Sequence, residues 1–157
     1  MNCVPQHLRA YWAEFLASAQ GVTGADGSFY EAFRIGADAN DANEAAALIL
    51  SGEKTATSSL LWEYQGSAKP PPSPGCLSVL EDGAGKTVCV VTTTRVEIIP
   101  FREVDAQFAY DYGEGDRTLE GWRETFWRYY SRACAECGHE MSEDTLLVCE
   151  QFRVVYA

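Results

Sequence analysis

The segment around which the chain is organised reads Leu50-Ser51-Gly52-Glu53-Lys54-Thr55-Ala56-Thr57-Ser58-Ser59-Leu60. An apolar helical run ends at Gly52, whose backbone can adopt the left-handed conformation that closes a helix and allows a ligand to approach. Lys54 then provides a cation, and the hydroxyl side chains that follow provide hydrogen-bond donors and acceptors. A lysine beside hydroxyl groups suits a phosphate, a carboxylate or a polarised carbonyl. The alternative is a solvated junction between a helix and a loop, since loops are commonly polar.

The length of 157 residues favours a single domain, residues 1–157. A hydrophobic content of 46%, with four Trp, eight Tyr and seven Phe, supports a buried core. No apolar run has the length needed to cross a bilayer, and residues 1–10 lack the order of a signal peptide. We therefore expect a cytoplasmic protein without membrane attachment. The sequence leaves the choice between a monomer and a dimer open.

The net charge is −11, from 23 acidic and 12 basic residues. This excess of negative charge opposes non-specific attraction to phosphate backbones. A local basic groove in an acidic body is still compatible with a nucleic-acid ligand, whereas a wide electrostatic footprint is not expected.

Six cysteines are present, and we expect mostly reduced thiols because no secretion signal is seen. Cys134 and Cys137, followed by His139, form the one cluster with the spacing of metal ligands. A structural zinc site needs four ligands, and Cys149 is the only nearby fourth. A loop with two free thiols is therefore our expectation for this cluster.

Two helices are predicted in the first third of the chain. Apolar residues at helical spacing predict an amphipathic helix over about residues 5–18, within an N-terminal helical extension of residues 1–40. Residues 26–36 are expected to form a short helical or irregular piece. Asp41, followed by Glu44 three residues later, predicts the start of the helix that Gly52 ends. If Ser58 or Ser59 caps a further short helix, that helix would point its amino end back at the Lys54 segment.

Strand patterns dominate the middle and the end of the chain. Residues 76–80 and 87–99 flank turn-forming residues 81–85, which predicts a hairpin. The second strand of this hairpin is long enough to bend round the corner of a barrel. Residues 65–75 are rich in proline and predict an extended connector. Alternating apolar residues predict a last strand over 145–156.

Two charged residues interrupt these apolar patterns. Glu150 lies on the apolar face of the last strand, and Arg95 interrupts the long strand of the hairpin. A carboxylate in such a place is either paired or functional. We favour an ion pair between Arg95 and Glu150.

A second polar segment reads Tyr110-Asp111-Tyr112-Gly113-Glu114-Gly115-Asp116. Glycine on both sides of Glu114 allows the backbone to aim its carboxylate. Asp116 is expected to cap a helix over about residues 117–133, a role that leaves Glu114 unexplained. Lys54, Thr57 and Glu114 could run acid–base or nucleophilic chemistry, in which the carboxylate moves the proton. Alternatively, Glu114 and Asp116 could hold a divalent cation that assists phosphodiester cleavage.

Three segments resemble one known family. Gly52-x-Lys54-x-x-Thr57 matches the signature of the ASCH domain, a compact β-barrel related to the PUA RNA-binding fold. The turn Gly113-Glu114-Gly115-Asp116 with Trp122 after it, and the closing Cys149-Glu150-x-Phe152, look like the longer bacterial members. The resemblance covers about residues 45–156. It implies an α+β fold in which a PUA-like mixed β-barrel of about five to six strands, flanked by helices, occupies residues 41–157.

The resemblance also implies ligands and activities. Some members are ribonucleases, and other, shorter ones hydrolyse acylated cytidine with a catalytic Lys, Thr and Glu. Lys54 and Thr57 match that motif position by position, and we infer Glu114 as the third member from its turn. Three functions follow: a protein that binds single-stranded RNA and cleaves it with the help of Mg²⁺ or Mn²⁺, an amidohydrolase of N-acylated cytidine or a related modified nucleoside, and a non-catalytic module that binds a nucleotide or modified base. Further ligand contacts are expected from Gly52, Ser58, Ser59, Arg95, Asp116, Trp122 and Glu150.

Overall fold

The computed structural model describes residues 3–18 and 29–157. Its helices and strands are, in chain order, η1 Gln6–Leu8, α1 Arg9–Ala17, β1 Phe29–Phe33, α2 Ala39–Ser51, β2 Ala56–Leu60, α3 Leu61–Gln65, β3 Leu77–Glu81, β4 Thr87–Pro100, η2 Phe101–Glu103, α4 Ala106–Tyr112, α5 Leu119–Glu136 and β5 Leu146–Tyr156. The strands form one sheet in the order β1-β3-β4-β5-β2. The predicted α+β class, with five strands, flanking helices and an N-terminal helix, is confirmed. None of the described helices combines the length and the apolar character that a membrane span requires.

The chain divides into two compact units. The first unit comprises Met1–Gly52, Pro72–Arg95 and Phe152–Ala157, and the second comprises Glu53–Pro71 and Val96–Gln151. These units do not test the predicted division into an extension of residues 1–40 and a barrel of residues 41–157, which stays a prediction.

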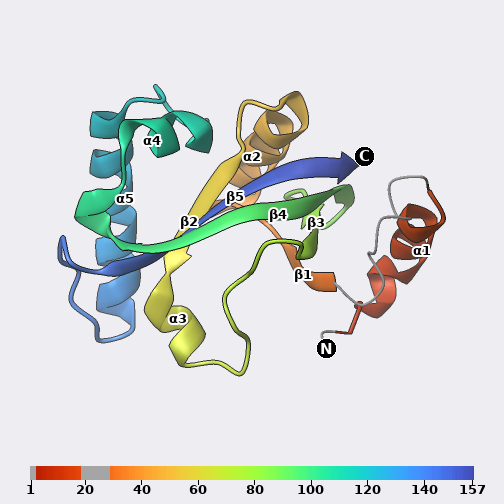
Figure 1. Cartoon of the computed structure of the whole chain (residues 1–157), viewed down its shortest axis with the longest axis horizontal. Helices are drawn as coiled ribbons and strands as arrows, with labels where there is room; N and C mark the ends of the chain where they lie inside the picture. The colour runs from red at the N-terminus through yellow and green to blue at the C-terminus, as the bar shows by residue number, and fades with distance from the viewer. Residues whose placement is uncertain (1–2, 19–28) are drawn as a thin grey trace. The chain divides into compact units, whose positions relative to one another are not determined.

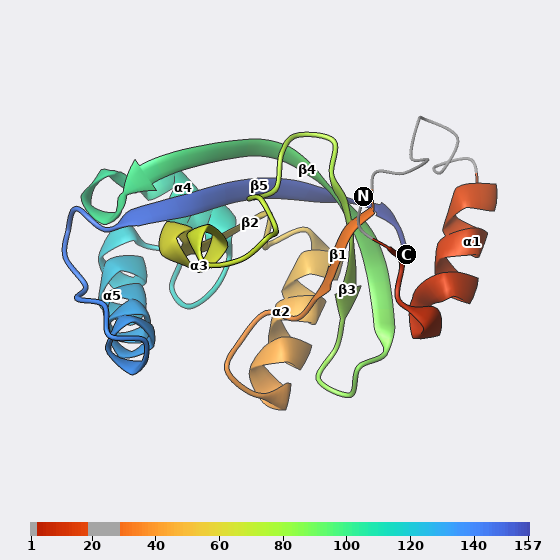
Figure 2. The same ribbon diagram turned by 90° about the horizontal axis from the view of Figure 1, so that it is seen from below.

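In the first unit, β3 and β4 form the predicted antiparallel hairpin, with Leu77 opposite Thr92. Figure 2 shows β1 alongside β3, and the two strands run parallel. The prediction of a helical or irregular piece over 26–36 is therefore wrong for residues 29–33, while residues 26–28 lie outside the described residues. Phe29 and Tyr30 are both buried, and aromatic residues favour such a half-buried pleated surface.

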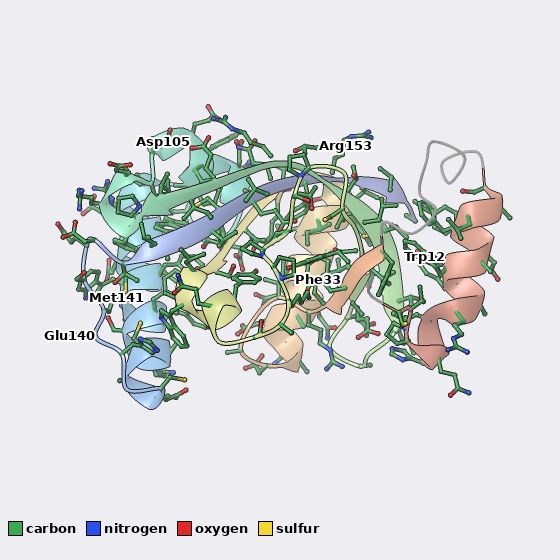
Figure 3. All side chains as sticks on the ribbon, turned by 60° about the horizontal axis from the view of Figure 1, so that its bottom comes forward. Trp12, Phe33, Asp105, Glu140, Met141 and Arg153 are labelled. Carbon is green, nitrogen blue, oxygen red and sulfur yellow. The ribbon has the colours of Figure 1, made fainter. Side chains whose placement is uncertain are left out.

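The core of the first unit has two parts. The predicted N-terminal helix packs Leu8, Trp12 and Phe15 against residues of β3 and β4, and Trp12 is labelled in Figure 3. Helix α2 contributes Ala46 and Ile49 to the other part, which contains apolar residues of β3, β4 and β5.

The ends of α2 follow from local hydrogen bonding. Asp38 caps its start, because the carboxylate accepts a hydrogen bond of 2.9 Å from the backbone N–H of Asp41. The predicted start at Asp41 is thus three residues late, and Asp41 lies in the first turn. Gly52 ends the helix as predicted, in the left-handed conformation with φ of 82°.

In the second unit, β2 pairs antiparallel with β5, so that Thr57 lies opposite Glu150. Ser58 and Ser59 belong to β2, and α3 starts after Leu60 without a side-chain cap, so neither serine caps a helix. Figure 1 shows α4 lying beside the start of the long helix α5. These helices bury a mainly apolar core against β2 and β5.

The start of α5 also differs from the prediction. Thr118 is its cap, since the Thr118 hydroxyl accepts a hydrogen bond from the backbone N–H of Gly121. Asp116 instead accepts hydrogen bonds from the backbone N–H and the hydroxyl of Thr118, at 2.9 and 2.7 Å. Arg117 between them has a positive φ of 62°, which moves Asp116 out of the cap position.

Gly113 and Gly115 provide a matched test of the turn that follows α4. Both have a positive φ, 72° and 64° respectively. A Cβ atom on Gly113 would clash with the carbonyl oxygen of Glu53 and lie 2.7 Å from the Cα of Lys54, whereas a Cβ on Gly115 meets nothing within 4 Å. The two positions therefore share conformational strain but differ in available space.

We expect Gly113→Ala to lower the free energy of unfolding by about 3 kcal/mol, because backbone strain and a steric clash add together. Gly115→Ala adds only the strain and should lower it by about 1 kcal/mol. Urea denaturation followed by tryptophan fluorescence measures both values. Equal losses in the two variants would show that the turn does not press on the Lys54 backbone.

Candidate functional site

Lys54 is enclosed in the second unit, and none of its side chain is exposed. Its ammonium group donates hydrogen bonds to the carbonyl oxygens of Ala56 at 2.8 Å and Tyr112 at 3.1 Å, and to the carboxylate of Glu114 at 3.0 Å. The same nitrogen lies 3.5 Å from the centroid of the Tyr112 ring. All three donors of the ammonium group therefore have acceptors, and an aromatic face covers the cation.

The end of helix α4 explains why a cation is held here. The helix ends at Tyr112, with Gly113 in the left-handed conformation and no basic residue in its last turn. The last carbonyl groups of a helix lack partners within the helix, and together they carry partial negative charge. Lys54 supplies the missing cation from another segment.

Two further contacts hold the α4 turn against the segment before β2. The backbone N–H of Thr55 donates to the carbonyl of Asp111 at 2.8 Å. The guanidinium of Arg117 donates to the carbonyls of Tyr110 at 3.0 Å and Glu53 at 3.2 Å, and stacks over the Tyr110 ring. These contacts make the position of Glu114 relative to Lys54 a property of the fold.

Burial has a direct electrostatic effect on Lys54. Removal from water lowers the pKa of Lys54 to about 8, and this decrease is opposed by the neighbouring carboxylate of Glu114, which raises the pKa. Because this pKa still lies above neutral pH, most Lys54 side chains are charged at pH 7. Glu114, with a third of its side chain exposed, is the member of the pair that a ligand can reach.

Hydroxyl groups lie on the other side of Tyr112. The Ser58 hydroxyl lies 2.5 Å from the hydroxyl of Tyr130 and donates to that of Tyr112 over 3.4 Å. Burial raises the pKa of both tyrosines above the usual range, while hydrogen bonds from Ser58 and Thr57 to Tyr112 partly oppose this effect. The two tyrosines therefore remain protonated donors at neutral pH.

Glu114 opens onto a pocket of about 360 Å³ beside the first turns of α5. The rings of Trp122 and Phe126 contribute to its wall, as do the side chains of Glu124 and Arg128. The buried indole N–H of Trp122 has no hydrogen-bond partner among the described residues. The pocket thus combines carboxylates, one guanidinium and flat aromatic surfaces.

The structure brings four of the predicted site residues together. Lys54 contacts Glu114 directly, and Thr57 and Ser58 reach the same cluster through Tyr112. Asp116 and Trp122, also predicted, line the adjoining pocket.

The other predicted residues have different surroundings. The Ser59 hydroxyl is hydrogen bonded to that of Tyr64 at 2.9 Å. Glu150 is half-buried on β5 opposite Thr57, and its ion pair with Arg95 stays a prediction. Gly52 and Arg95 belong to the first unit, where Gly52 ends α2 and Arg95 is exposed on β4.

Three contributors were missed from the sequence, namely Tyr112, Arg117 and Tyr130. A usable signal existed for Tyr112, because a residue just before a helix-ending glycine offers a free carbonyl. Arg117 and Tyr130 carry no comparable signal, since their roles depend on contacts with segments far away along the chain.

The cysteine cluster does not have the arrangement of ligands that a zinc site needs. Cys134 is buried in the core, Cys137 is exposed, and the ring of His139 stacks on Trp62 with centroids 4.1 Å apart. No group of three or more His, Cys, Asp or Glu side chains that could hold a metal occurs within residues 3–18 and 29–157.

The pair Glu114 and Asp116 as ligands of Mg²⁺ or Mn²⁺ stays a prediction. Lys54 occupies one carboxylate oxygen of Glu114, and Thr118 occupies one of Asp116. Only the second oxygen of each carboxylate is left for a cation, and water would have to supply the remaining ligands.

The pKa of Lys54 provides a test of this site. With ¹³C-labelled lysine, the Cε signal of Lys54 should titrate near pH 8, reflecting its lowered pKa. Glu114→Gln removes the charge that raises the pKa of Lys54, so the midpoint should move further down. An unchanged or higher midpoint in this variant would contradict the ion pair.

The same shift makes a prediction for stability. The unfolded chain keeps the Lys54 proton up to about pH 10.5, whereas the folded chain loses it near pH 8. The unfolded state then binds more protons, so the Lys54 contribution to the free energy of unfolding increases between these two pH values. Urea denaturation should show the difference between wild type and Lys54→Met increasing with pH over this interval.

The chain was compared with known proteins. The family model of the ASCH domain matches residues 31–156. The crystal structure of an ASCH domain from Lactobacillus crispatus JV V101 is 34% identical, with a TM-score of 0.90 over 100% of this chain and 99% of that one. The protein EF3133 from Enterococcus faecalis V583 is 28% identical, with a TM-score of 0.82 over 96% of this chain and 89% of that one. A search of the curated proteins finds no match. The chain belongs to the ASCH domain family.

Proposed function

We propose that this ASCH domain binds a nucleobase, as part of a modified nucleoside or of single-stranded RNA, in the pocket beside Glu114. The observation that carries the proposal is the 3.0 Å contact between a completely buried ammonium and a carboxylate that is one-third exposed. Because buried Lys54 holds Glu114, the Glu114 carboxylate is a hydrogen-bond acceptor at a fixed position in the wall of the pocket.

Burial of an ammonium group is unfavourable by several kcal/mol, even when it is partly offset by an ion pair. Such a pair is weak support for stability and stronger support for a function that needs the carboxylate in one place. A nucleobase presents amino and imino N–H groups that a carboxylate accepts. Its flat ring also suits the partly exposed ring of Phe126 in the pocket wall, while Trp122 is buried and stacks on Phe126.

The pocket is less suited to a phosphate. Glu114, Asp116 and Glu124 all contribute to its wall, and the whole chain has a net charge of −11. Lys54 has no exposed surface with which to contact a phosphate. Base recognition therefore has more support than metal-assisted cleavage of the RNA backbone.

Hydrolysis of N-acylated cytidine is a second candidate. It is favoured by the cluster of Lys54, Thr57 and Glu114 around Tyr112. In this reaction the Glu114 carboxylate takes a proton from water, which attacks the acyl carbonyl carbon. The bond between that carbon and the cytidine nitrogen then breaks, the nitrogen takes the proton, and a carboxylic acid and cytidine leave. Lys54 would act as a positioning residue that holds the Glu114 carboxylate in place through their 3.0 Å contact.

Calorimetric titration with cytidine, N4-acetylcytidine and short single-stranded RNA tests the binding proposal. Glu114→Gln should weaken binding about tenfold or more, because a hydrogen bond to a charged group is lost. Glu140→Gln removes the same charge at an exposed position labelled in Figure 3 and serves as the control. Equal affinities of the two variants for every ligand would contradict the proposal.

Turnover is measured separately. Chromatography of N4-acetylcytidine incubated with the protein should show cytidine released by wild type and not by Glu114→Gln if the second candidate is correct. Labelled RNA incubated with and without Mg²⁺ or Mn²⁺ tests cleavage in the same way. Binding without either product would identify a non-catalytic module.

A further inference from the structure

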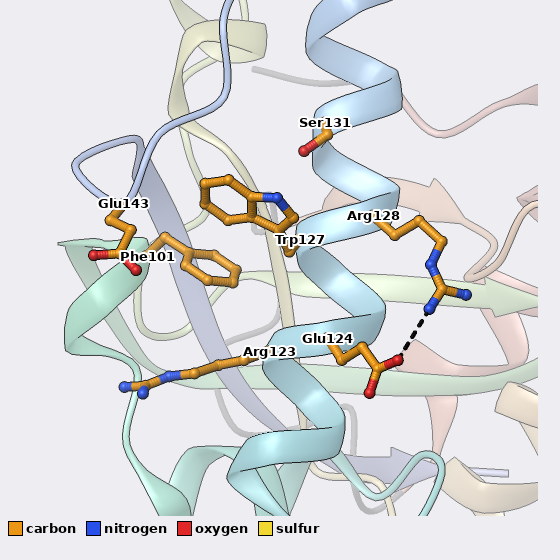
Figure 4. Close-up of a pocket in the computed structure, with 7 residues that line it drawn as sticks. All are labelled: Phe101, Arg123, Glu124, Trp127, Arg128, Ser131 and Glu143. Atoms are coloured by element: carbon orange, nitrogen blue, oxygen red, sulfur yellow. Dashed lines mark hydrogen bonds and ion pairs between the residues drawn. The ribbon is translucent and has the colours of Figure 1, made fainter.

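A second hollow, of about 580 Å³, lies on another side of α5 (Figure 4). Trp127 and Phe101 are its aromatic residues, with ring centroids 5.5 Å apart and nearly edge-on. Trp127 is 39% exposed although it is a large apolar side chain. Contact with Phe101 fixes the indole while part of its surface stays open, which is the property of a platform for stacking.

An arginine with an unneutralised charge borders this hollow. One nitrogen of the Arg123 guanidinium donates to the carbonyl oxygens of Arg102 at 3.1 Å and Val104 at 3.3 Å. Within the part of the chain that the structure describes, no carboxylate forms an ion pair with Arg123. The guanidinium is therefore held in place, keeps its full charge and has further donors for an anion.

A carboxylate, that of Glu143, also lines this hollow. Figure 4 shows the side chain of Glu143 beside Phe101, on the side of Phe101 that faces away from Trp127, with the guanidinium of Arg123 toward that same side. A ligand that matches these groups has an anionic group for Arg123, a flat ring for Trp127 and N–H donors for the carboxylate of Glu143. A nucleotide has all three, in its phosphate, its base and the amino groups of the base.

The hollow adjoins the pocket beside Glu114. Glu124 and Arg128 line both of them, and these two side chains form an ion pair of 3.3 Å one turn apart on α5. The pair is thus a wall common to the two cavities. If a single-stranded RNA places one base beside Glu114, its chain has only to cross this wall to bring a neighbouring nucleotide over Trp127.

We infer that Trp127 and Arg123 form a second nucleotide subsite, so that the ligand of the Glu114 pocket is a base within single-stranded RNA and not a free nucleoside. The inference rests on the proposed function, since it names the substrate class of that pocket. Arg123 supplies the phosphate contact that the acidic pocket itself lacks.

The test compares the affinity for single-stranded RNA with the affinity for single nucleosides. Fluorescence anisotropy measures binding of labelled RNA of about five nucleotides, made from each of the four bases in turn. Calorimetry measures binding of the nucleosides. The best RNA should bind about tenfold more tightly than its nucleoside, because one more base stacks. Trp127→Ala should remove this gain and leave nucleoside affinity unchanged, while Trp127→Phe should retain most of it. Tyr129→Ala, which removes a ring that is 50% exposed on the same helix, should change neither affinity.

Salt dependence tests the role of Arg123. Loss of one phosphate contact should reduce the slope of log affinity against log salt by about 0.7 for a single strand. Arg123→Gln should show this reduction, whereas Arg132→Gln, at an exposed arginine of α5 that lines neither cavity, should leave the slope unchanged. Circular dichroism spectra establish that each variant is folded before binding is measured.

The outcomes separate the two proposals. If Trp127→Ala binds RNA as tightly as wild type while Glu114→Gln binds nucleosides weakly, the subsite is overturned and the proposed function stands. If Glu114→Gln changes neither affinity, the proposed function fails. If Trp127→Ala leaves RNA binding intact but changes the molar mass measured by light scattering, the hollow is a protein interface, which also overturns the subsite.

Discussion

The buried charge of Lys54 is the constraint on which the second unit depends. An ammonium group without exposed surface needs every one of its donors satisfied, and the acceptors come from three places along the chain. The register of β2 sets the carbonyl of Ala56, the end of α4 sets the carbonyl of Tyr112, and the following turn sets Glu114. Displacement of any one of these segments would leave a charge buried and incompletely paired.

This arrangement gives Lys54 and Glu114 different roles. Lys54 lies inside and meets only protein groups, whereas Glu114 reaches the pocket and can meet a ligand. The lysine of the motif therefore holds the Glu114 carboxylate, and in the proposed function it is this carboxylate that contacts the ligand. Reading the motif as a cation exposed beside hydroxyls would give the wrong sign of charge at the site.

The features that local sequence determines were predictable, and those set by distant partners were not. The end of α2 at Gly52, the β3–β4 hairpin and the last strand follow from glycine, turn residues and alternation. Strand β1 was missed because its parallel partner is more than forty residues away along the chain. Thr118 was missed as a cap because the left-handed conformation of Arg117 has no sequence signal. Lys54 and Glu114, both candidates from the sequence, contact each other in the structure, and their role as site residues stays a prediction. The burial of Lys54 against Tyr112 depends on tertiary contacts that the sequence does not show.

The ion pair between Glu124 and Arg128 has a consequence for motion. Both side chains are largely exposed, at 73% and 69%, so solvent screens their attraction and the pair contributes little to stability. Long side chains of this kind change rotamer within nanoseconds. The Glu124 and Arg128 side chains that separate the two cavities can therefore change conformation rapidly. The buried Lys54 cluster, which is held by three hydrogen bonds, stays in place.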